Sequence, residues 1–139
     1  EMMDAVQRFT EAYEQARQSP TDDNILKLLE SLLPFSPPGL EWGLEVASIA
    51  GITYILEGGR AVAVRVSRDE FGPFMQTSVA EIPVSSIPSS ALREVRNVEA
   101  FMRRITSHLR EWVSRMPAGD SRRTAVETLL RAVSQAGER

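Results

Sequence analysis

The sequence predicts an α+β fold: a central antiparallel β-meander of about four strands, flanked by two N-terminal and two C-terminal helices. Two observations support this prediction. Apolar residues recur every three or four positions near both ends of the chain, whereas between about residues 41 and 84 they tend to alternate with a period of two. Clusters of proline, glycine and serine separate these segments. The 139 residues, 42% of them hydrophobic, suit one globular domain over residues 1–139.

The first predicted helix covers residues 2–18, because its apolar residues fall on one helical stripe. Ser19 and Pro20 end this helix, since a proline disfavours helical geometry in the residue before it. Thr21 can then cap a second helix over residues 22–33. The stripe of the first helix consists of Met2, Val6, Phe9, Tyr13 and Ala16.

The second helix is apolar around most of its surface, which is unusual for a helix that packs on one side only. We therefore expect it to lie between other elements or at a subunit interface. At an interface, its side chains and a phenylalanine in the proline-rich segment that follows would bind another protein. Otherwise they only cover the sheet. The candidate interaction residues are Ile25, Leu28, Leu29, Leu32 and Phe35.

A β-hairpin is the clearest feature of the central segment. Gly58 and Gly59 separate two runs of β-forming residues, and a glycine pair suits a two-residue hairpin turn with positive φ. In the resulting register Glu57 faces Arg60 across the turn. The four expected strands cover residues 41–49, 52–57, 60–67 and 75–84.

Further along the hairpin, the register places Ile55 opposite Val62 and Thr53 opposite Val64, so branched side chains meet on one face of the sheet. The alternation continues to Val66, and we expect these three valines to form the core-facing side of their strand. A sheet of only four strands also leaves its other face or an edge open. Pairing between subunits would cover it and make a symmetric dimer.

The predicted C-terminal helices cover residues 90–116 and 121–135. A serine after Pro88 can cap the first helix, and the Pro117-Ala118-Gly119 segment separates the two helices. The first helix has a broad apolar stripe made of Val98, Phe101, Met102, Ile105, Leu109, Trp112 and Met116.

Composition excludes several classes of chemistry. Cysteine is absent and His108 is the only histidine, which excludes disulfides, thiolate metal sites, cysteine nucleophiles and sites with several histidine ligands. A net charge of −3 argues against binding nucleic acid or anionic membranes through overall charge. No apolar run approaches the roughly 18 residues of a membrane-spanning helix. We therefore expect a cytoplasmic protein with no cofactor and no membrane partner.

Arginines gather on the predicted helix over residues 90–116, on the side opposite its apolar stripe. This face could bind the phosphates of a nucleic acid, bind an acidic protein surface, or simply be a hydrated face paired with neighbouring carboxylates. Basic residues outnumber acidic ones beyond residue 90, although the whole chain is acidic. The residues considered for phosphate binding are Arg96, Arg103, Arg104, Arg110 and Arg115.

An enzymatic site would have to draw on few residues. Asp69 and Glu70 lie together in a loop and could act as acid and base or hold a hard cation. His108 offers an imidazole, but its neighbour Ser107 points about 100° away on a helix, so the two do not make a nucleophile and base. We expect a solvated turn and a structural histidine, and therefore no enzyme.

The hypothesis that follows is a non-enzymatic protein-interaction module of the adaptor or chaperone-like kind, acting as a homodimer. Its partner would be another protein, bound through the sheet and the apolar helical surface. The alternative is a nucleic-acid-associated protein that binds phosphates through the arginine-rich face. Binding that weakens steeply with salt would favour the alternative.

Overall fold

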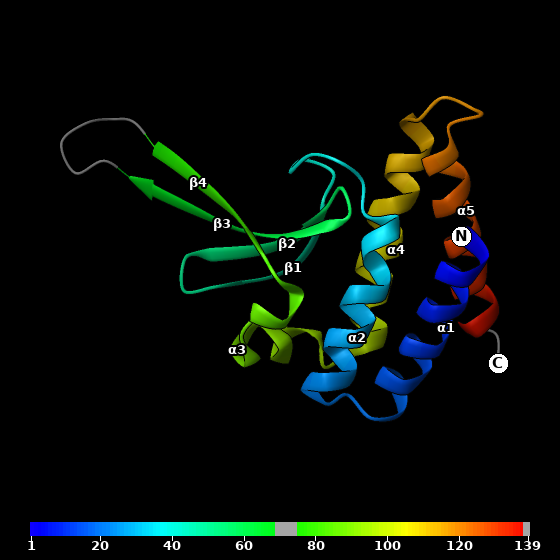
Figure 1. Ribbon diagram of the computed structural model, residues 1–139, viewed down its shortest axis with the longest axis horizontal. Helices are drawn as coiled ribbons and strands as arrows, with labels where there is room; N and C mark the ends of the chain where they lie inside the picture. Colours follow the sequence, from blue (N-terminus) through cyan, green and yellow to red (C-terminus); the bar gives the residue numbers. More distant parts are fainter. Residues whose placement is uncertain (69–74, 138–139) are drawn as a thin grey trace.

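The computed structural model describes residues 1–68 and 75–137 of the chain (Figure 1). Within these residues it has the predicted α+β architecture, a four-stranded antiparallel meander with helices before and after it. Three short 3-10 turns supplement the regular elements: η1 (Leu33–Phe35), η2 (Val84–Ser86) and η3 (Arg93–Val95). The helices are α1 (Met2–Gln18), α2 (Asp22–Leu32), α3 (Ser89–Leu92), α4 (Val98–Arg115) and α5 (Ser121–Gly137). The strands are β1 (Leu44–Ile49), β2 (Ile52–Glu57), β3 (Arg60–Arg68) and β4 (Met75–Ile82).

The boundary between α1 and α2 lies where the sequence predicts it. Ser19, which ends α1, has an extended backbone (φ −146°, ψ 91°) before Pro20. Thr21 caps α2 by accepting a hydrogen bond of 3.2 Å from the backbone N–H of Asn24. The apolar segment then turns through η1, so α2 is slightly shorter than expected.

The predicted long helix over residues 90–116 is wrong in its first third. Residues 89–92 form α3, residues 93–95 form η3, and α4 begins only after Asn97. The Asn97 side chain accepts a hydrogen bond of 3.1 Å from the backbone N–H of Ala100, and its own backbone is not helical (φ −79°, ψ 79°). Asparagine favours this capping position over a helix interior, which explains the break.

The hairpin register is confirmed, with Glu57 opposite Arg60 and Ile55 opposite Val62. Gly58 and Gly59 have φ values of 58° and 89°, as the two-residue turn requires. The predicted first strand is shortened, because β1 begins at Leu44 rather than at residue 41. The last strand ends at Ile82, since Pro83 cannot donate a hydrogen bond to the ladder.

The face of β3 that joins the main core carries Ala61 and Ala63, so the expectation that the three valines supply this face is wrong. Val62 is buried on the opposite face, and Val66 is 49% exposed. Alanine and valine alternate along β3, and a period of two does not show which of two apolar faces meets the helices. The outer face of the sheet is therefore also apolar.

The helices α1, α2, α4 and α5 gather on one side of the molecule and the sheet lies on the other (Figure 1). One continuous core joins them, built from both helical and strand residues. The β3–β4 hairpin extends away from the helices, with β4 as an outer strand of the sheet in the order β1-β2-β3-β4 (Figure 1). The largest fully buried side chains include Phe9, Ile25, Leu44, Leu56, Met102, Ile105, Leu109 and Leu129.

Candidate functional site

The apolar residues proposed for protein binding lie inside the core, so of the two expectations for this helix the position between other elements is confirmed and the interface is wrong. The helix α2 contacts α1, α3, η1 and η2, so its neighbours cover it on several sides. Of its apolar members, only Leu26 and the adjoining Leu33 are partly exposed. The five candidates Ile25, Leu28, Leu29, Leu32 and Phe35 are each at most 2% exposed.

Two of the five arginines considered for phosphate binding already have structural partners. The Arg104 guanidinium donates to the backbone carbonyls of Glu45 (2.6 Å) and Val46 (3.2 Å), where a β-bulge interrupts the pairing of β1 with β2. Arg115 donates to the Glu111 carboxylate at 3.0 Å and lies over the Trp42 ring, 5.4 Å from its centroid. The arginine face of α4 is therefore divided between two sides of the molecule.

Arg103 and Arg110 lie on the other side, along a cavity of about 480 Å³ between α1, α4 and α5. Neither forms an ion pair with any residue in the described part of the chain. Arg17 lines the same cavity but is paired with Glu99 at 3.6 Å. Arg96 is exposed and lies before the first residue of α4, so the structure does not bring all five arginines together.

Tyr13, a buried residue of α1, also lines this cavity. Burial raises its pKa, and the nearby Arg17 guanidinium opposes this shift. Tyr13 therefore stays neutral near pH 7 and can donate a hydrogen bond. The cavity combines a neutral donor with two guanidinium groups that lack carboxylate partners among the described residues.

Of the three residues considered for catalysis, Asp69, Glu70 and His108, the structure describes His108 alone. Asp69 and Glu70 lie outside the described residues. His108 donates from Nε2 to the backbone carbonyl of Trp42 at 2.8 Å, which is a structural role. Within the described ranges, no group of three His, Asp or Glu side chains could hold a metal ion, and no helix is both long and apolar enough to cross a bilayer.

The strand β4 is the most exposed strand of the sheet, and one of its two edges is unpaired among the described residues. Within the described chain, β4 pairs with β3 only. Hydrogen-bonded and non-hydrogen-bonded residue pairs alternate along an antiparallel ladder. When this alternation is followed from the Gly58-Gly59 turn through β3 to β4, the backbone N–H and C=O groups of Thr77, Val79 and Glu81 point away from β3. All three of these residues are exposed.

Residues that usually protect an edge strand are scarce in β4. From Gln76 to Ile82 it has no proline and no lysine, and Glu81 is its one charged residue. Val79 is 44% exposed and lies opposite Val64 on the outer face, where Val66 adds a second exposed valine. An apolar strip therefore borders the open backbone. The sequence predicts an available edge or face but not that β4 provides it.

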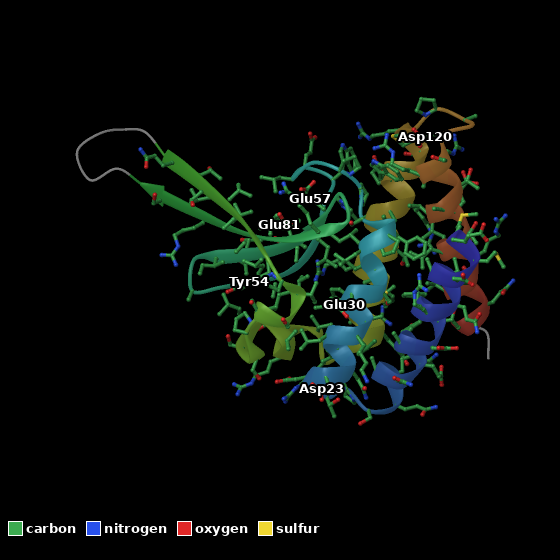
Figure 2. The ribbon with its side chains drawn as sticks, in the orientation of Figure 1. Asp23, Glu30, Tyr54, Glu57, Glu81 and Asp120 are labelled. Carbon is green, nitrogen blue, oxygen red and sulfur yellow. The ribbon has the colours of Figure 1, made fainter. Side chains whose placement is uncertain are left out.

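A buried carboxylate stabilises the Gly58-Gly59 turn between β2 and β3. Glu57 accepts hydrogen bonds from Arg60 Nε at 2.6 Å and from the backbone N–H of Gly39 at 2.8 Å. The bond from Arg60, and then the one from Gly39, lowers the pKa of Glu57 below its ordinary value of 4.5. Figure 2 shows Glu57 and Glu81 on the sheet, where Arg60 reaches Glu81 at 4.0 Å.

No protein-family model, no curated protein and no solved structure matches this chain. The fold and the exposed surfaces are therefore the basis for the functional proposal below.

Proposed function

We propose that this protein is a non-enzymatic protein-interaction module that forms a homodimer by pairing β4 with β4 of a second copy. The observation that carries this proposal is the open edge of β4, with its outward-facing backbone groups at Thr77, Val79 and Glu81. Unpaired edges of this kind add a strand readily. The proposal replaces the helical surface expected from the sequence with the sheet edge.

A second copy suits this edge because β4 is self-complementary. A two-fold axis perpendicular to the sheet makes the paired strands antiparallel and places residues of the same face opposite each other. With the axis at Val79, that residue meets its own counterpart, and Glu81 lies opposite Thr77 of the second copy. No like charges face each other, and the exposed valines meet at the centre of the interface.

This pairing would join two four-stranded sheets into one sheet of about eight strands, which is within the usual range for open sheets. It would also cover the exposed part of the β3–β4 hairpin that extends away from the helices (Figure 1). The edge of a folded sheet is thus converted into an interior strand pair. A homodimer built this way can present both helical layers to further protein partners.

Light scattering on a size-exclusion column tests the proposal. We expect a mass twice the 15.5 kDa of the chain, in both low and high salt. Val79→Pro removes an outward N–H without removing a bond to β3, so this variant is expected to be monomeric and folded. Val79→Thr keeps the N–H and the branched shape and should remain dimeric. A monomeric wild-type chain, or a dimeric Val79→Pro variant, would contradict the proposal.

A second candidate function is phosphate binding at the cavity between α1, α4 and α5. The observation in its favour is that Arg103 and Arg110 line this cavity with no carboxylate partner in the described residues. For a nucleic-acid strand, we expect affinity to fall steeply with salt and to drop about tenfold or more in Arg103→Glu/Arg110→Glu. Arg96→Glu, outside the cavity, is the control. A nucleic-acid affinity that changes neither with salt nor in the double variant would exclude this candidate.

A further inference from the structure

A second cavity, of about 290 Å³, lies where the β2–β3 turn approaches the helices. The loop after α2 forms one wall, and the facing ends of α4 and α5 form the other. Its side-chain walls are mainly apolar, with a single charged group. The residues that matter here are Phe35, Pro37, Gly59, Trp112, Arg122 and Val126.

Hydrogen bonds hold the loop against the turn, so this cavity is formed in the folded chain. Gly58 donates its N–H to the carbonyl of Pro37 at 3.0 Å. Gly59 donates its N–H to the hydroxyl of Ser36 at 2.9 Å, and that hydroxyl donates to the Leu33 carbonyl at 2.7 Å. A ligand therefore does not have to order this wall when it binds.

Trp112 is a buried residue that lines this cavity and carries an indole N–H. Only 4% of this residue is exposed, yet its indole N–H donates to no atom in the described residues. The indole nitrogen is not fully buried, because Asp22 Oδ1 is the one fully buried side-chain nitrogen or oxygen without a partner among the described residues. Since Trp112 lines this cavity, an acceptor placed inside the cavity can meet that N–H.

Arg122 places a positive charge at the same cavity. Its guanidinium is 3.5 Å from the Asp120 carboxylate, and the other oxygen of Asp120 accepts the Arg122 backbone N–H at 2.8 Å. This pair anchors Arg122 at the start of α5, near the labelled Asp120 in Figure 2. A guanidinium has five N–H donors, so one contact with Asp120 leaves others available for an anion.

We propose that this cavity binds a small hydrophobic carboxylate. The apolar body of the ligand packs against Phe35, Pro37 and Val126, and its carboxylate accepts hydrogen bonds from Trp112 and Arg122. The volume is at the lower end for ligand cavities, which limits the occupant to a compact molecule. This site is independent of the β4 edge and of the homodimer.

Calorimetric titration with three matched probes tests the site: 3-phenylpropionate, 3-phenylpropanol and 3-phenylpropylamine. We expect the wild-type chain to bind the carboxylate at least about tenfold more tightly than the alcohol, and to bind the amine least. A hydrogen bond to a charged group commonly accounts for such a factor.

Three variants assign the binding to this cavity. Arg122→Gln should bring the carboxylate and the alcohol within about twofold of each other, since it removes the charge. Trp112→Phe keeps an aromatic ring without the N–H and should weaken carboxylate binding about fivefold or more. Arg131→Gln, also on α5 but outside the cavity, should bind like the wild type.

The proposal is overturned if the wild type shows no carboxylate binding up to about 10 mM, which corresponds to less than 3 kcal/mol of binding energy. It is also overturned if Arg122→Gln retains the preference for the carboxylate. If circular dichroism shows that Trp112→Phe is unfolded, the test rests on Arg122→Gln alone, because Arg122 is exposed and its replacement is not expected to unfold the protein.

Discussion

Arg104 donates a hydrogen bond of 2.6 Å to the backbone carbonyl of Glu45, across 59 positions of sequence. A second bond of 3.2 Å reaches the carbonyl of Val46, the residue at which the β1–β2 register shifts. A single side chain of α4 therefore satisfies two backbone acceptors at the bulge of β1. This contact explains why an arginine in an apparent phosphate-binding face is a structural residue.

Arg104→Ala should lower the free energy of unfolding by about 1–2 kcal/mol, because it leaves both bulge carbonyls without their donor. Arg103→Ala, one position away, should change stability by less than about 0.5 kcal/mol. Urea denaturation followed by circular dichroism measures both. Equal losses in the two variants would refute the structural role assigned to Arg104.

Leu29→Ala should destabilise the protein by about 2–5 kcal/mol, since Leu29 is fully buried in the core. Lys27→Ala, on the exposed side of the same helix, should have little effect. Thermal unfolding distinguishes these expectations. An unchanged stability in Leu29→Ala would restore the interpretation of α2 as an interaction surface.

Glu57→Gln should reduce stability by about 1–2 kcal/mol at neutral pH, because the buried carboxylate loses its charged bond with Arg60. The folded pKa of Glu57 lies below its ordinary value of 4.5, so its stabilising contribution is complete above that value. It is lost as the pH falls through the folded pKa. Denaturation measured from pH 7 to pH 3 should therefore show the two proteins converging in acid. A difference independent of pH would contradict the assignment.

The β2–β3 hairpin could be predicted from sequence because its signal is local. Gly58-Gly59 specifies the turn, and the turn fixes the register on both sides. The face of β3 that meets the helices depends on tertiary packing instead. Ala61 and Val62 are both buried, on opposite faces, so alternation alone does not distinguish the inside from the outside.

The candidate sites were less predictable than the fold. The apolar α2 fits a core helix and an interface helix equally well by sequence, and only the position of α1 and α3 around it decides between them. Leu92, Val95 and Val98 follow one another at a helical spacing of three across the break at Asn97, so only the capping residue signalled the break. The cavity beside Trp112 joins four segments distant in sequence, which no local pattern indicates.

The pairing of β4 with β4 is tested most directly by a cysteine at its proposed centre. The chain has no cysteine of its own, so Val79→Cys introduces a single thiol. In the proposed register the two copies of residue 79 have Cα atoms about 5.5 Å apart, a distance that a disulfide spans.

Glu81→Cys is the matched control, because its two copies would be about 13 Å apart along the strands. In a glutathione redox buffer at micromolar protein, we predict covalent dimers for Val79→Cys and almost none for Glu81→Cys, as read by non-reducing electrophoresis. Equal cross-linking of the two variants, or none in either, would contradict the account.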